Sequence, residues 1–103
     1  MKRSLLITTV VIAAWGLASS AQAAGNADTG KAKAAACAGC HGPEGKGVAP
    51  NPPLAGIPEA EQVQMLKDYK SGKRPNPIMK GLTAALSDQD MEDLSAYYAS
   101  LPK

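Results

Sequence analysis

The chain has no phenylalanine, and its other aromatic residues are one tryptophan and three tyrosines, so only 4% of its 103 residues are aromatic. Aromatic rings usually provide much of the apolar volume in the core of a small domain. The length allows one compact domain at most. A core built mainly from the chain's own large rings is therefore excluded, and we expect a bound group to fill part of the interior.

Cysteine, histidine and net charge are scarce as well. Two cysteines are too few for a small fold held together by disulfides, and one histidine excludes any site that needs two. The formal net charge is +2, from 11 basic and 9 acidic residues, and no run of Lys and Arg is interleaved with aromatic residues. Nucleic-acid binding is therefore excluded.

Residues 1–23 have the three regions of a secretory signal peptide. Lys2 and Arg3 precede an apolar stretch over residues 5–17, and the segment ends in Ala-Gln-Ala. This stretch is shorter than the roughly 20 residues that a membrane span needs, although an uncleaved anchor is the alternative. We expect cleavage after Ala23, which leaves residues 24–103 as a single domain with equal numbers of basic and acidic residues.

The rest of the sequence predicts an all-α fold, because no stretch alternates with period two for long enough to form a strand. Its helices have recognisable ends: Asn26 is a candidate N-cap, Ser87 and Asp90 resemble a capping box, and Gly72 is a candidate helix end. We predict three main helices and two long ordered loops, with these bounds: a helix from about residue 28 to Cys40, a loop over 42–58, a helix over 58–72, a loop over 73–81 and a helix over 88–101.

The segment Cys37-Ala38-Gly39-Cys40-His41 has the C-x-x-C-H pattern that attaches a c-type haem. Two intervening residues place both sulfurs on neighbouring positions of one helical turn, where each forms a thioether with one haem vinyl group. His41 follows directly, so its imidazole falls beneath the iron as an axial ligand. We therefore predict one covalently bound haem c, which would also supply the missing core volume.

Three other uses of these residues were compared with haem attachment. A thioredoxin-like redox pair needs a βαβ context, which this chain lacks. A structural zinc site needs about four ligands, but Cys37, Cys40 and His41 are the only cysteines and histidine. A disulfide between the two cysteines would close a very small loop and leave the core unfilled.

Methionine is the expected second axial ligand, because His41 is the only histidine. Met65 and Met91 lie within predicted helices, where methionine more often fills the core. Met79 lies in the predicted loop over residues 73–81, which is free to cross the opposite face of the haem. We predict His41 and Met79 as the iron ligands, and the alternatives are Met65, Met91 and an open coordination position.

Residues 28–101 resemble the class I c-type cytochromes, the small monohaem electron carriers of bacterial periplasms. The resemblance implies a cytochrome c-like fold, with its helices and long loops wrapped around one covalently bound haem. It is carried by the following features: Gly30, Cys37 to Gly42, the Asn-Pro-Pro-Leu-Ala-Gly segment at 51–56, Met79, and Leu94 to Leu101 with its pair of tyrosines.

The resemblance also implies specific contacts. Gly30 would let Tyr97 or Tyr98 of the last helix cross the first helix closely. The carbonyl of Pro52 would bind the second ring nitrogen of His41 and so orient the ring, and Leu54 would pack on the haem.

The sequence departs from the family pattern at two places. Members often have Phe at the position of Ala34, and they carry a Trp beside the haem propionates, which the mature chain lacks. The donors to the propionates therefore stay open among four residues: Tyr69, Lys73, Arg74 and Asn76.

With two axial ligands, the iron has no open position for a substrate. We therefore expect a periplasmic, monomeric electron carrier that is not an enzyme and exchanges single electrons with periplasmic or membrane-bound redox proteins through an exposed haem edge. The alternative is the haem c subunit of a periplasmic dehydrogenase, such as a flavocytochrome. Ligand sensing or peroxidase-like activity would require an iron that Met79 does not bind.

Basic residues are concentrated before and around Met79. They either form a docking rim with an apolar centre near Ile78 or an ordinary solvated face. These residues are Lys67, Lys70, Lys73, Arg74 and Lys80.

Overall fold

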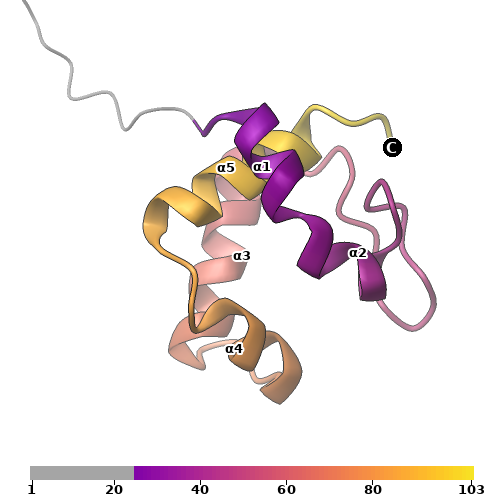
Figure 1. Ribbon diagram of the computed structural model, residues 1–103. Coiled ribbons are helices and arrows are strands. Elements are labelled where there is room, and N and C mark those ends of the chain that lie inside the picture. Colours follow the sequence, from indigo (N-terminus) through magenta and orange to yellow (C-terminus); the bar gives the residue numbers. More distant parts are fainter. Residues whose placement is uncertain (1–24) are drawn as a thin grey trace, which may run out of the picture.

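The computed structural model describes residues 25–103, so the expected signal peptide at residues 1–23 lies outside the described residues. The described chain contains five helices and no strand: α1 Ala27–Lys33, α2 Ala35–His41, α3 Glu59–Ser71, α4 Pro77–Thr83 and α5 Asp88–Ala99. Figure 1 shows α1 and α5 against each other at one end of the molecule and α4 at the other, with α3 reaching both ends. The predicted all-α class is confirmed. Within residues 25–103, none of the helices has the length and apolar composition that a membrane crossing needs.

The predicted helix ends are largely confirmed. The side chain of Asn26 accepts a hydrogen bond from the backbone of Thr29 at 3.0 Å and starts α1. Ser87 and Asp90 form both bonds of a capping box at the start of α5, at 3.0 and 2.9 Å. Gly72 ends α3 with a φ angle of 85°, in the left-handed region.

The predicted first helix is wrong in one respect, because the chain forms two helices that meet at Ala34. Two amide groups bond to the carbonyl of Ala34, that of Cys37 at 2.9 Å and that of Ala38 at 2.9 Å. The bond from Cys37 spans three residues and tightens the turn locally. Ala34 is buried at this junction against Leu94 and Tyr98, so tertiary packing determines where the helix changes direction.

The predicted loop over residues 73–81 is also wrong, because residues 77–83 form α4. Pro77 occupies the first helical position, where its missing N–H group leaves no hydrogen bond unmade. The side chain of Asn76 accepts hydrogen bonds from the backbone of Ile78 and Met79, each at 3.1 Å. A proline inside the predicted loop therefore starts a helix.

The close approach of α1 to α5 depends on Gly30, which is buried. A Cβ atom at this position would lie 2.9 Å from the Cβ of Tyr97 and would overlap the backbone carbonyl of Asp93. Of the two tyrosines that the family resemblance allowed, Tyr97 is therefore the one at the crossing. Only glycine permits this distance between the two helix backbones.

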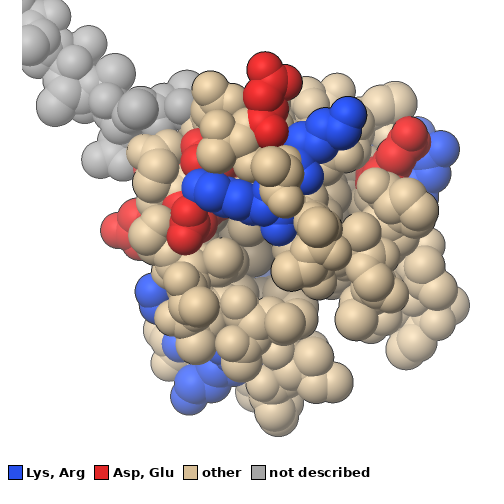
Figure 2. All heavy atoms as spheres, in the orientation of Figure 1, with Lys and Arg blue, Asp and Glu red and all other residues tan. Residues whose placement is uncertain are grey.

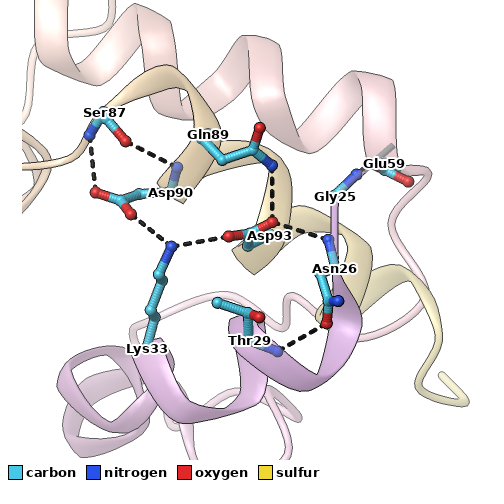
Figure 3. Close-up of polar contacts among 9 residues, drawn as sticks. All are labelled: Gly25, Asn26, Thr29, Lys33, Glu59, Ser87, Gln89, Asp90 and Asp93. Carbon is cyan, nitrogen blue, oxygen red and sulfur yellow. Dashed lines mark hydrogen bonds and ion pairs between the residues drawn. The ribbon is translucent and has the colours of Figure 1, made fainter. Parts of the chain in front are cut away.

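A polar network holds the same two helices together (Figure 3). Lys33 of α1 binds Asp90 at 2.6 Å and Asp93 at 2.8 Å, both on α5. Asp93, which is only 3% exposed, also accepts hydrogen bonds from the backbone of Asn26 at 2.8 Å and the side chain of Gln89 at 2.9 Å. Lys33, then Asn26 and Gln89, lower the pKa of Asp93 to about 2.

Tyr98 of α5 joins the helices to the loop over residues 42–58. Its side chain is 1% exposed and packs in the core with Ala34 and Leu94. A Cβ atom on Gly45 would lie 2.7 Å from the ring of Tyr98, so the loop backbone passes directly over this ring. The Tyr98 carbonyl also accepts a hydrogen bond from Gly56 at 2.9 Å. This tyrosine supplies the aromatic volume that Ala34 does not.

We predict that Gly30→Ala lowers the free energy of unfolding by about 2 kcal/mol or more, because the added methyl group forces α1 away from α5. Gly81→Ala is the matched control, since nothing lies within 4 Å of a Cβ atom there and alanine favours a helix by about 1 kcal/mol. Urea denaturation of both variants measures the difference. Equal stabilities would contradict the tight crossing.

We predict that Asp93→Asn lowers the free energy of unfolding at pH 7 by about 2 kcal/mol, because charged hydrogen bonds are lost. The folded pKa of about 2 lies below the ordinary 3.8, so the ionised carboxylate stabilises the fold above about pH 4. This advantage over the variant declines as the pH falls toward 2. Urea denaturation across this range tests the prediction, with Asp88→Asn as control, and a pH-independent difference would contradict it.

Candidate functional site

One cavity lies between the helices and the loop over residues 42–58. Figure 2 shows the molecule hollowed between the lobe that contains α4 and the lobe that contains this loop. Side chains from α1, α2, α3, α4, α5 and the loop meet here. The residues that line the cavity are Lys33, Ala36, Cys37, Cys40, His41, Asn51, Pro52, Leu54, Gln62, Met65, Leu66, Tyr69, Asn76, Ile78, Met79, Leu82, Thr83, Leu86, Leu94 and Tyr98.

All six residues predicted for the site line this cavity: Cys37, Cys40, His41, Pro52, Leu54 and Met79. They come from three separate parts of the chain, α2, the following loop and α4. Of the two alternative methionines, Met65 also lines the cavity. Met91 does not, because its side chain is 0% exposed in the packing of α5.

The imidazole of His41 has a defined orientation. Its Nδ1 atom lies 2.8 Å from the carbonyl oxygen of Pro52, and a carbonyl oxygen can only accept. Nδ1 therefore carries the proton, which leaves the lone pair of Nε2 available for a metal. This is the contact that the family resemblance implied. The neighbouring Asn51 donates to the carbonyl of Cys40 at 2.9 Å and ties the loop to the end of α2.

Met79 is presented by a helix that has polar support at both ends. Asn76 caps its start, and the hydroxyl of Thr83 donates to the carbonyl of Met79 at 2.7 Å. Thr83 is 1% exposed and lines the cavity. As Figure 1 shows, α4 lies on a different side of the molecule from α2, so Met79 and His41 reach the cavity from separate walls.

Several cavity residues were not identified from the sequence. The apolar spacing in α3 indicated Val63, Leu66 and Tyr69 as one face, but the face toward the cavity consists of Gln62, Met65, Leu66 and Tyr69. These four residues are three or four positions apart in the sequence, so they share one face of the helix. Gln62 carries no apolar signal, so the spacing of apolar residues did not identify it.

The four residues considered as propionate donors divide into two pairs. Tyr69 and Asn76 line the cavity, whereas Lys73 and Arg74 do not. The guanidinium of Arg74 lies over the ring of Tyr69, 5.4 Å from its centre. Arg74 therefore lies behind a cavity residue and not on the cavity surface.

The interior of the site is weakly polar. Burial raises the pKa of the Cys37 thiol and of the Tyr98 hydroxyl, so both groups are neutral at pH 7. Cys37 and Cys40 are not joined by a disulfide in the structure. Within residues 25–103, no group of three or more His, Cys, Asp and Glu side chains could hold a metal ion alone, which argues against a zinc site.

These residues fit a haem group. Two neighbouring thiols and an oriented imidazole stand on one wall, and a thioether approaches from another. Most of the remaining wall is apolar, formed for example by Leu54, Leu66 and Leu94. A flat apolar porphyrin with one iron atom requires this combination of groups.

The chain matches the family described as cytochrome c over residues 27–102. It belongs to the cytochrome c family. Family membership implies that the bound group is haem c, and it agrees with the free Cys37 and Cys40 beside His41. The expected cytochrome c-like fold is confirmed, with α4 as an addition to the three main helices that the sequence predicted.

Individual relatives show how this cytochrome c domain compares with longer and shorter proteins. The chain is 48% identical over 98 residues to cytochrome c4 of Pseudomonas aeruginosa, covering 94% of this chain and 46% of the relative. It is 37% identical over 81 residues to cytochrome c-554(548) of Halomonas halodenitrificans, covering 75% of this chain and 98% of the relative.

A solved structure agrees with these relatives. The crystal structure of reduced recombinant cytochrome c4 from Pseudomonas stutzeri is similar with a TM-score of 0.72 and 39% identity, covering 77% of this chain and 47% of that one. The chain therefore spans about half the length of the cytochromes c4 that it matches, and nearly the whole length of the Halomonas protein.

Proposed function

We propose that this protein is an electron carrier with one haem c, attached through Cys37 and Cys40 and bound axially by His41 and Met79. The observation that carries the proposal is the meeting of all four residues in one largely apolar cavity. When bound, the haem supplies a reversible one-electron change at its iron. Two axial ligands would leave no position for a substrate, so we propose no enzymatic activity.

The other cavity residues support this function. The carbonyl of Pro52 holds the proton on Nδ1 of His41, so that Nε2 is the nitrogen available to iron. Leu54 provides part of the apolar wall. A methionine opposite a histidine favours a higher reduction potential than harder donors do.

We further propose that the chain is exported to the periplasm and cleaved after Ala23, and that residues 24–103 form one domain and act as a monomer. The sequence of residues 1–23 supports export. The alternative, a haem c subunit of a dehydrogenase such as a flavocytochrome, would use the same site. Size-exclusion chromatography of the exported protein separates the two, because a subunit would elute with a larger partner.

The mouth of the cavity suits a brief encounter with a redox partner. Ile78 and Leu82 of α4 line the cavity and remain 71% and 46% exposed. On the face in Figure 2, the surface beside the hollow is uncharged, and Lys and Arg side chains stand at the far edge of the α4 lobe. We propose that an apolar mouth with nearby basic residues such as Lys73 and Lys80 docks partners that carry acidic surfaces.

We predict that Met79→Ala removes the far-red absorption band that arises from methionine sulfur bound to ferric iron, because Met79 is the only sulfur-containing residue of α4. Met65→Ala is the matched control, since Met65 lines the same cavity from α3 and should leave the band unchanged. Absorption spectra of the oxidised exported proteins provide the measurement. Wild-type protein without the band would overturn the assignment of Met79.

Mass spectrometry of the same samples tests haem attachment separately. Wild type and both methionine variants should each exceed the mass of polypeptide 24–103 by one haem, because all of them keep Cys37 and Cys40. Protein that folds and is exported without this added mass would contradict the proposed function as a whole.

We also predict that the reduced protein is oxidised faster by anionic ferricyanide at low salt than at high salt, because the basic residues of the proposed docking surface would attract this anion. Lys80→Glu should slow this reaction several-fold at low salt. Lys46→Glu is the control, because Lys46 lies on the other lobe and pairs with Glu44 at 3.3 Å. Stopped-flow oxidation rates that do not change with salt concentration would contradict the proposed basic docking surface.

A further inference from the structure

Gln62 is a buried polar residue whose position the fold alone does not explain. It lies in α3, it is 2% exposed, and it lines the cavity together with Met65 of the same helix. Its backbone N–H donates to the carbonyl of Pro58 at 3.0 Å, so the backbone is satisfied. The side-chain oxygen Oε1 is buried and has no hydrogen-bond partner among the described residues.

Four other polar side chains around the cavity have partners of their own. Asn51 binds the carbonyl of Cys40, Asn76 caps α4, Thr83 binds the carbonyl of Met79, and Lys33 binds two aspartates. The hydroxyl of Tyr98 is also unpartnered, but its ring fills the core between the helices and the loop. Gln62 has neither a partner nor a ring to pack.

An unpartnered buried amide is costly, by about 1–3 kcal/mol, and an apolar side chain of the same shape would avoid this loss. Methionine has nearly the same length, and the adjacent cavity position on α3 is already Met65. The amide at position 62 therefore lowers stability without a compensating contact inside the protein, and the group that it can serve is one bound in the cavity that it lines.

We propose that Gln62 sets the reduction potential of the cytochrome by presenting an amide dipole to the haem cavity. This inference rests on the proposed haem site. Because no protein group holds Oε1, the amide can turn toward whichever state of the haem attracts it more. The ferric porphyrin core carries one positive charge and the ferrous core carries none, so the dipole stabilises the ferric state and lowers the potential.

Spectroelectrochemical titration of the exported holoprotein tests this role with the near-isosteric Gln62→Met. We expect the variant to be easier to reduce. At the midpoint potential of the wild type, the reduced variant should exceed the oxidised variant about threefold or more. A tenfold excess would correspond to a potential 59 mV higher. Gln62→Glu keeps a polar group in the same place, so its potential should not rise.

Gln64→Met is the matched control, because Gln64 lies two residues further along α3, is exposed and binds Asp68 at 2.8 Å. It should keep the wild-type potential. A purely structural role would change the stability of Gln62→Met and leave its potential unchanged, and that result would overturn the proposal. An equal rise in Gln62→Glu would overturn it too.

Two further measurements separate this inference from the function on which it rests. The added mass of one haem and the far-red band are recorded first: if wild type lacks them, the proposed site fails, whereas an unchanged potential with both present rejects only the role of Gln62. Gln62→Leu is a second apolar variant in case the methionine packs badly. If neither folds with haem, the amide is needed for folding, which contradicts the proposal.

Discussion

The close crossing of α1 over α5 at Gly30 is the contact on which the rest of the molecule depends. It holds α1 against α5, and α2, which follows α1 directly, carries Cys37 and His41 to one wall of the cavity. Helix α5 carries Tyr98, whose ring lies in the core and contacts the backbone of the loop over residues 42–58. The same loop supplies the carbonyl that orients the imidazole. The pair of helices α1 and α5 therefore positions the C-x-x-C-H segment, the loop over residues 42–58 and the Pro52 carbonyl that orients His41.

Ionic contacts and apolar surface meet beside this crossing at Lys33, which also lines the cavity. The carboxylates of Asp90 and Asp93 on α5 bind its ammonium, and Asp93 is nearly removed from solvent. The cavity side is formed mainly by aliphatic and sulfur-containing side chains. The proposed covalent attachment and the apolar walls would hold the haem in the cavity, while ionic contacts of Lys33 hold the helix pair together.

Local sequence patterns predicted the parts of the structure that local physics controls. The spacing of Cys37, Cys40 and His41 and the capping box at Ser87 depend on neighbours within a few residues, and they were found directly. The junction at Ala34 could not be predicted, because alanine favours an uninterrupted helix and only packing against α5 reveals the break. The helix at Pro77 was missed because proline both breaks helices and starts them. Gln62 was missed because its burial breaks the usual link between polarity and exposure.

The short helix around Met79 has a consequence for the speed of electron exchange. A methionine on a long unsupported loop could shift when iron changes its charge, and each shift would add to the activation barrier. Here the backbone of α4 is held at Asn76 and Thr83, on either side of Met79. With the imidazole likewise tied to a carbonyl, the proposed iron ligands would keep nearly the same geometry in both oxidation states. Such a protein would exchange electrons with a small reorganisation energy, which suits a carrier whose encounters are brief.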